Sequence, residues 1–228
     1  AGKNLRLHPA SKVFAHFPHT VSGGHGVPQD LGYRNPGMPH IVFEGIFTPR
    51  AAAVSLLQAA GSKRRWWLDN YQNVASFGFM RLDNDANGSV RSFRDFTFLD
   101  YPLSKKSAGE LAEAARFCAE VFFAAGADCV LLPFAGCKNE FTSLSDLSEF
   151  DFLKISPSQI MSSGFHPQGT AAMGIVVDAD LNLVGTKNVS VCDASVLPGS
   201  PGVNPQITIM GLGLRHAHKL SKLLRNFD

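Results

Sequence analysis

The segments that contain candidate functional residues lie near the two ends of the chain. A middle of strands and helices separates them. Residues 1–15 and 160–228 are dominated by Gly- and Pro-shaped loops and a terminal helix, whereas residues 20–158 are typical of a sheet with flanking helices. The 228 residues suffice for one large domain or two small ones. We therefore expect an α+β chain of two lobes, with the middle inserted into a lobe that both ends build.

Apolar, β-branched or aromatic runs between turn residues predict strands at residues 41–47, 73–82, 89–98 and 130–134. The second and third of these runs flank a polar cluster that contains Asn87-Gly88, which predicts a hairpin. Helical spacing of apolar residues predicts helices at residues 51–60, 108–125 and 206–224. Residues 1–40 are rich in Gly, Pro and His, show weak periodicity and give no strand prediction.

Composition excludes several classes of protein. A formal net charge of +2 gives no electrostatic case for nucleic acid or for an anionic membrane surface, and no apolar run of about 20 residues is present. The basic run at residues 63–65 is expected to be a solvated helix end, although its neighbours Trp66 and Trp67 leave membrane association open. We expect a cytoplasmic or membrane-peripheral location.

The cysteines and histidines show no metal-ligand spacing, so no metal site is predicted. Four free thiols in a reducing compartment are expected, with Cys118 and Cys192 buried in apolar segments. A disulfide between Cys129 and Cys137 stays open as the alternative, because nothing in the sequence argues for it or against it.

Three motifs near the C-terminus carry most of the functional information. Residues 165–174 have the sequence Phe-His-Pro-Gln-Gly-Thr-Ala-Ala-Met-Gly, residues 191–198 have Val-Cys-Asp-Ala-Ser-Val-Leu-Pro, and residues 202–208 have Gly-Val-Asn-Pro-Gln-Ile-Thr. Near the N-terminus, residues 2–9 have Gly-Lys-Asn-Leu-Arg-Leu-His-Pro. Together these motifs resemble the glucose-methanol-choline (GMC) family of flavin oxidoreductases, and residues 191–209 resemble its long-chain fatty alcohol oxidase branch.

The resemblance implies an FAD-dependent oxidation of a primary alcohol, extending to long-chain alcohols, in which His166 is the catalytic base. A histidine that titrates near neutral pH suits removal of the hydroxyl proton. Asn204 would orient the substrate hydroxyl by hydrogen bonding. The structural alternative is that Asn204 caps the last helix, with Pro205 at its first position. By the same resemblance, His8 is structural rather than catalytic.

The resemblance also implies which residues contact FAD. Asp193 and Ala194 would lie beside its ribityl and pyrophosphate groups, whereas the alternative for Asp193 is a turn cap. Pro205, Gln206 and Ile207 would open a helix whose positive end faces the flavin.

The family's domain plan, carried onto this sequence, divides the chain into three segments. Residues 1–15 and 159–228 would belong to the FAD domain, of α/β, Rossmann-like type, and residues 16–158 would form an antiparallel-sheet substrate domain with flanking helices.

The sequence departs from the family in one respect, because no Gly-x-Gly-x-x-Gly motif follows a strand. The N-terminal half of the FAD domain is therefore expected to be absent, and the chain alone is expected to bind FAD weakly or not at all. Its expected partners are a small-molecule alcohol and an N-terminal FAD-binding segment or subunit. Two alternatives remain open: a GMC-type lyase or decarboxylase, and a truncated, non-catalytic substrate-binding module.

Overall fold

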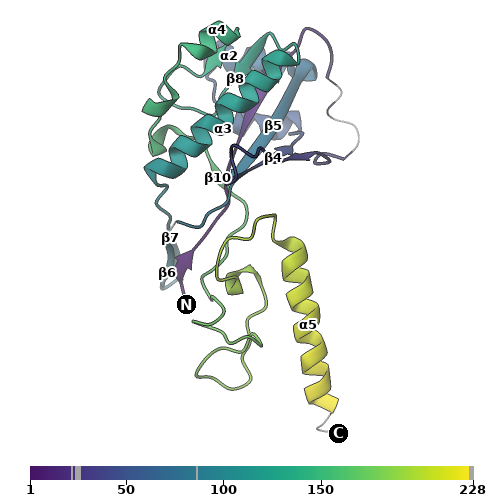
Figure 1. Cartoon of the computed structure of the whole chain (residues 1–228), viewed down its shortest axis with the longest axis vertical. Coiled ribbons are helices and arrows are strands. Elements are labelled where there is room, and N and C mark those ends of the chain that lie inside the picture. The colour runs from purple at the N-terminus through teal and green to yellow at the C-terminus, as the bar shows by residue number, and fades with distance from the viewer. Residues whose placement is uncertain (22, 24–26, 86, 226–228) are drawn as a thin grey trace. The chain divides into compact units, whose positions relative to one another are not determined.

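A computed structural model describes residues 1–21, 23, 27–85 and 87–225 (Figure 1). The chain divides into two compact units. The motif unit comprises residues 1–8, 82–102 and 164–228, and the sheet unit comprises residues 9–81 and 103–163. Compared with the expected segments, residues 9–15 and 159–163 fall in the sheet unit and residues 82–102 fall in the motif unit. Which unit binds the substrate or the cofactor stays a prediction.

The sheet unit is built on a seven-stranded sheet in the order β3-β4-β5-β2-β8-β9, with β10 beside β2. The pairings along the main path are antiparallel. The strands are β2 (Pro9–His16), β3 (Gly32–Tyr33), β4 (Ile41–Gly45), β5 (Val74–Arg81), β8 (Cys129–Leu131), β9 (Glu140–Phe141) and β10 (Ser163–Gly164). The expected strands at residues 41–47 and 130–134 are therefore present, in shortened form.

Strand β2, which the sequence did not predict, lies at the centre of this sheet. It pairs with β5 over seven consecutive residues, from Ala10 opposite Met80 to His16 opposite Val74. Its residues Val13, Phe14 and Ala15 are all buried, because helices cover both faces of the sheet. A strand buried on both faces has a continuous apolar run instead of an alternation, so its periodicity is weak.

Helix α3 (Lys105–Ala124) covers one face of the sheet, as Figure 1 shows. Its side chains Leu111 and Ala115 pack with Val13, and the Ser104 hydroxyl caps its first turn by accepting from the Ser107 N–H at 3.0 Å. Gly126 follows the helix with φ of +96°, a left-handed conformation that suits glycine after a helix end. The expected helix at residues 108–125 is confirmed.

The opposite face carries α1 (Arg50–Leu56) and α2 (Gly61–Asp69). Trp67 of α2 is fully buried against Phe14, whose side chain points away from those of Val13 and Ala15. The predicted helix at residues 51–60 ends early at Leu56, and α2 was not predicted. The unit also contains η1 (Tyr71–Asn73), α4 (Leu144–Ser148), η2 (Phe152–Lys154) and η3 (Pro157–Gln159).

The motif unit has a three-stranded antiparallel sheet in the order β1 (Lys3–Leu5), β6 (Gly88–Phe93) and β7 (Phe96–Asp100). The expected hairpin between residues 73–82 and 89–98 is wrong, because β5 pairs inside the sheet unit. The hairpin lies instead within the single run that was predicted as one strand. Phe93 pairs with Phe96, and Arg94 enters the two-residue turn with a positive φ of 52°.

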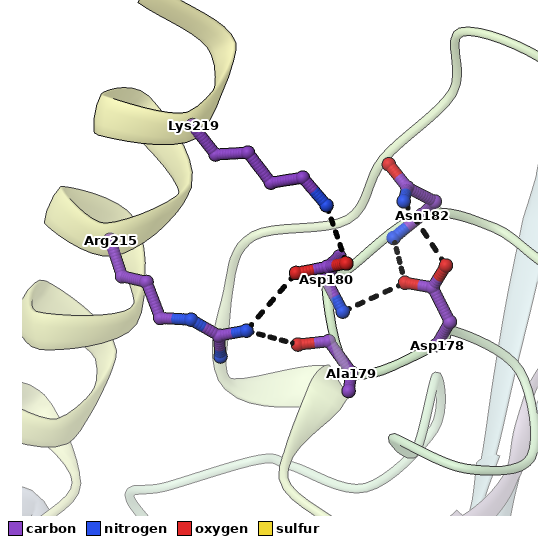
Figure 2. Close-up of polar contacts among 6 residues, drawn as sticks. All are labelled: Asp178, Ala179, Asp180, Asn182, Arg215 and Lys219. Atoms are coloured by element: carbon purple, nitrogen blue, oxygen red, sulfur yellow. Dashed lines mark hydrogen bonds and ion pairs between the residues drawn. The ribbon is translucent and has the colours of Figure 1, made fainter. Parts of the chain in front are cut away.

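Helix α5 (Gln206–Arg225) completes the motif unit together with η4 (Ala194–Val196), and the expected helix at residues 206–224 is confirmed. Figure 2 shows how α5 is tied to the turn at residues 178–182. Arg215 donates to the Ala179 carbonyl at 2.7 Å and pairs with Asp180 at 3.2 Å, and Lys219 pairs with the same carboxylate. Such exposed pairs contribute little stability individually, but two of them one helical turn apart fix the rotation of the helix.

The described cysteines are all free thiols, so no Cys129–Cys137 disulfide forms in this structure. Cys118 and Cys129 are buried, Cys137 is half-buried and Cys192 is exposed. The expectation that Cys192 is buried is wrong, because residues 189–192 lie in a surface loop whose one bridge joins Asn182 to Ser190. Among the described helices, none is long and apolar enough to cross a membrane.

The substitution Leu111→Ala should lower the free energy of unfolding of the sheet unit by about 2–5 kcal/mol, because it leaves a cavity under α3. The matched control is Leu153→Ala, since Leu153 is 95% exposed and should change stability by less than about 0.5 kcal/mol. Urea unfolding followed by tryptophan fluorescence reports on this unit, since both tryptophans belong to it. Equal losses for the two variants would contradict the described packing of α3.

Candidate functional site

His166 is held by a short ladder between the two ends of the chain. Two residues after it, the Arg6 N–H donates to the Gln168 carbonyl at 2.9 Å and the Gln168 N–H donates to the Arg6 carbonyl at 3.0 Å. Gly169 follows with φ of +88°, and a Cβ there would lie 2.4 Å from the Asn4 carbonyl oxygen. Only glycine allows this approach, so the motif around His166 is fixed by residues 4–6 of the same unit.

The ring of His166 contacts the ring of His8. The two Nδ1 atoms lie 2.8 Å apart, and the rings meet edge to face with centroids 4.9 Å apart. His8 is fully buried, whereas His166 is half-buried. One ring nitrogen must donate and the other accept, so the protonation of the two histidines is linked. The Nε2 atom of His166 makes no hydrogen bond to any residue that the structure describes.

The other nitrogen of His8 reaches Ser200, which lies between the motifs at residues 191–198 and 202–208. His8 Nε2 lies 2.6 Å from the Ser200 Oγ, and this hydroxyl also accepts the Asp83 N–H at 3.2 Å. The buried Asp83 carboxylate accepts the Leu7 N–H at 3.0 Å and the Tyr101 hydroxyl at 2.7 Å. Segments from four parts of the sequence therefore share one hydrogen-bond network around His8, as buried polar groups require.

Burial, together with the positive charge of a protonated His166, lowers the pKa of His8 from 6.5 to about 4. The Pro201 carbonyl and the Asp83 carboxylate oppose this shift. Burial also lowers the pKa of His166. His8 is therefore neutral across the physiological range, and His166 keeps a neutral, proton-accepting form to a lower pH than an exposed histidine does.

The predicted partner Asn204 is exposed, and its side chain makes no hydrogen bond within the described part of the chain. The helix-capping alternative is not what the structure shows, since Pro205 directly precedes α5 and its carbonyl accepts the first helical hydrogen bond, from Ile209 at 2.9 Å. No direct contact joins Asn204 to His166. The two motifs are linked instead through Ser200 and His8.

Three of the five residues expected at the cofactor, Asp193, Gln206 and Ile207, are exposed. Asp193 is exposed and accepts the Ser195 N–H at 2.7 Å, so it does cap a turn, η4, and Ala194 begins that turn. Pro205 is buried, whereas Gln206 and Ile207 are exposed.

The surface at these residues fits a flavin in chemical terms. The N–H groups of Gln206, Ile207 and Thr208 precede the first helical bond and have no acceptor within α5, so they favour an anionic oxygen. A Cβ at Gly199 or Gly202 would meet nothing within 4 Å, so the backbone there is open to a ligand. Among the described residues, no group of three or more His, Cys, Asp or Glu side chains can hold a metal ion.

Sequence reasoning identified His166 but missed the residues that hold it. His8 was expected to be structural and no role was assigned to Asp83 or Ser200. The signal for His8 was present in the motif at residues 2–9. No sequence signal identified Asp83 or Ser200, since each contributes through the fold.

The family described as GMC oxidoreductase matches residues 75–213 of this chain. The uncharacterized GMC-type oxidoreductase Rv0492c of Mycobacterium tuberculosis (strain ATCC 25618 / H37Rv) is 33% identical over 222 residues, which cover 93% of this chain and 34% of the relative. The uncharacterized GMC-type oxidoreductase y4nJ of Sinorhizobium fredii (strain NBRC 101917 / NGR234) is 28% identical over 232 residues, which cover 95% of this chain and 44% of the relative.

Among solved structures, a variant of the Aspergillus oryzae RIB40 formate oxidase, studied for FAD modification, superposes with a TM-score of 0.68 at 15% identity. The match covers 100% of this chain and 48% of the formate oxidase. At this identity the likeness shows a shared fold. The chain thus spans between a third and a half of the length of these relatives.

The substitution Gly169→Ala should destabilise the motif unit by more than about 3 kcal/mol, because a clash with the Asn4 carbonyl adds to the cost of a positive φ. Gly174→Ala is the matched control. Gly174 also has a positive φ, +82°, but its Cβ would meet nothing within 4 Å, so only about 1–2 kcal/mol is expected. Urea unfolding followed at NMR signals of residues 164–225 measures both. A smaller loss for Gly169→Ala than for the control would contradict the described ladder.

Acidification should destabilise the motif unit through His8. Between pH 6.5 and about 4, His8 binds a proton in the unfolded chain but not in the folded chain. The free energy of unfolding therefore falls as the pH falls. Removing this group in His8→Gln should make the slope shallower by up to about 1.4 kcal/mol per pH unit in that window. His216→Gln, at a buried histidine bonded to Ser190, controls for the loss of a buried histidine elsewhere in the unit. Identical slopes for all three proteins would contradict a buried, neutral His8.

Proposed function

The chain belongs to the GMC oxidoreductase family, and on that premise we propose that it supplies the base and the substrate-orienting group for oxidation of a primary alcohol. Family membership supports FAD as the cofactor and an oxidoreductase as the class of enzyme. When bound, FAD accepts the hydride that leaves the alcohol carbon. The observation that carries the proposal is the state of His166, whose ring is anchored through Nδ1 while Nε2 has no partner in the described chain.

His166 serves as the base in this proposal. A base must keep a lone pair near neutral pH, and burial lowers the pKa of His166 in the direction that preserves one. The anchored ring cannot turn freely, so its bare nitrogen presents a fixed target for the substrate hydroxyl. The proton from that hydroxyl moves to His166 Nε2.

Asn204 is proposed to orient the substrate oxygen. Its amide is exposed and makes no hydrogen bond within the described residues, so its N–H groups are available to a ligand. An amide donor stabilises a developing alkoxide but does not exchange a proton at neutral pH. This division of roles leaves His166 as the sole base.

The proposed FAD contacts are Asp193, Ala194, Pro205, Gln206 and Ile207. The free N–H groups at the start of α5 suit the electron-rich side of a flavin, which becomes more negative on reduction. Asp193 and Ala194 offer a short turn at the surface against which a polar chain can lie.

We propose that a further FAD-binding segment or subunit completes the catalytic unit. An exposed apolar row on α5 supports this, since Ile207, Met210 and Leu214 recur on one side of the helix and are 83%, 65% and 61% exposed. Exposed apolar side chains at helical spacing normally have a partner. An FAD-bearing segment fits this row, because α5 also starts at the proposed flavin contacts.

The proposed substrate is a primary alcohol with an alkyl chain. The resemblance of residues 191–209 to the long-chain fatty alcohol oxidase branch supports this class of substrate. A preference for long-chain over short-chain alcohols is the expected consequence.

The first test is the visible absorption spectrum of the purified chain, alone and after addition of FAD. Because the chain spans less than half of the relatives' length, we expect flavin binding to become tight only with the FAD-bearing segment present. A flavin spectrum retained by the chain alone would contradict the need for that segment.

The second test is anaerobic reduction of the flavin-loaded protein by primary alcohols of increasing length. His166→Ala should slow flavin reduction by about 10²–10⁴-fold, the usual contribution of a general base. Asn204→Ala should slow it by about 10²–10³-fold, as loss of an oxyanion donor does. His218→Ala, at an exposed histidine of α5, should leave the rate unchanged. Turnover without net flavin reduction or electron acceptor would indicate a lyase or decarboxylase, and unaltered biological function of His166→Ala would indicate a non-catalytic module.

A further inference from the structure

We propose that His8 is a positioning residue that sets the tautomer of His166, holding its proton on Nδ1 so that Nε2 is bare. The inference rests on the proposed function, since a bare Nε2 matters only if His166 is a base. If His8 instead carried its proton on Nδ1, it would donate to His166 Nδ1, and His166 would then carry its own proton on Nε2. In that arrangement His166 would be a hydrogen-bond donor to the substrate. The tautomer of His8 thus decides whether His166 is a base.

The surroundings of His8 favour the arrangement that makes His166 a base. The second ring nitrogen, Nε2, faces the Ser200 hydroxyl at 2.6 Å. The Pro201 carbonyl also acts on the His8 ring and, because proline contributes only an acceptor, it favours an N–H on His8. With Nδ1 occupied by His166, that N–H belongs on Nε2. His8 Nδ1 then has a lone pair to accept the His166 Nδ1–H.

The same arrangement survives the reaction. After accepting the substrate proton, His166 is an imidazolium with N–H groups on both nitrogens. Only a His8 with a bare Nδ1 can stay hydrogen-bonded to it at 2.8 Å, so neither ring has to move. A buried neutral acceptor also stabilises the imidazolium.

The charged and titratable groups around the pair are consistent with this role. His8 faces His166 from one side and the Asp83 carboxylate acts on it from another. Asp83 is itself held by the Leu7 N–H and the Tyr101 hydroxyl, and Arg6 donates to the Asp83 carbonyl at 3.3 Å. The negative charge of Asp83 acts on the His8 ring without a direct hydrogen bond to it.

The test is the tautomer of His166, measured by long-range ¹H–¹⁵N correlation NMR on the FAD-free full chain. In the wild type we expect protonated Nδ1 and bare Nε2 at neutral pH. In His8→Phe, which keeps a ring but removes the acceptor, the Nδ1–H form should lose its dominance. His8→Gln offers a carbonyl oxygen as an acceptor and should restore it. His216→Gln, at the other described buried histidine with a serine partner, should leave the His166 signals unchanged.

A wild-type His166 with its proton on Nε2 would overturn the proposal, and so would an unchanged tautomer in a folded His8→Phe. Should His8→Phe not fold, the tautomer of wild-type His166 still decides. The Ser200→Ala variant removes the hydroxyl that faces His8 Nε2, so it too should reduce the Nδ1–H form of His166, and an unchanged tautomer there would count against the proposal. In flavin-loaded protein, His8→Phe should lower kcat by about 10–100-fold with KM little changed, and His8→Gln should recover part of the loss. Because the NMR readout needs no flavin, failure of the positioning role is distinguishable from failure of the proposed alcohol oxidation.

Discussion

The motif unit depends on backbone hydrogen bonds that residues 2–7 make to segments far away in the sequence. The Gly2 carbonyl accepts from Val90 at 2.7 Å, the Gly2 N–H donates to the Thr170 carbonyl at 2.9 Å, and Arg6 exchanges two hydrogen bonds with Gln168. One short segment therefore pairs with β6 and also with the motif that contains His166. Without it, the three parts of this unit would have no common partner.

The placement of His166 follows from that pairing. Arg6 is fixed opposite Gln168 in an antiparallel pairing. Two residues further along, His8 therefore lies opposite His166, and their rings are in contact. Two imidazoles at this distance cannot both be charged at low cost, and burial keeps His8 neutral. Ser200, which also accepts the Asp83 N–H, then satisfies the remaining ring nitrogen of His8. The result is a histidine whose orientation is set by backbone pairing instead of by its own loop.

Local patterns predicted the elements whose signals are local. Helices α3 and α5 and strand β4 have clear spacing and clear boundaries, and each was found. The hairpin prediction failed because the Asn-Gly rule assumes that successive strands pair, whereas β5 and β6 belong to different sheets. Strand β2 was missed because burial on both faces removes the alternation that marks a strand.

The site divides in the same way between local and long-range information. Sequence motifs identified His166 and Asn204 as candidates, and their roles stay predictions. The turn cap at Asp193 was predicted as the alternative to a cofactor contact, and the structure shows this cap. The cofactor contact stays a prediction. The contacts of His8 with His166 and Ser200 depend on tertiary pairing across most of the chain, which no window of sequence contains.

The discontinuous motif unit also affects synthesis, because His8 emerges from the ribosome 158 residues before His166. At about 5–20 residues per second this interval is roughly 8–30 s, during which the His8 ring lacks its His166 partner.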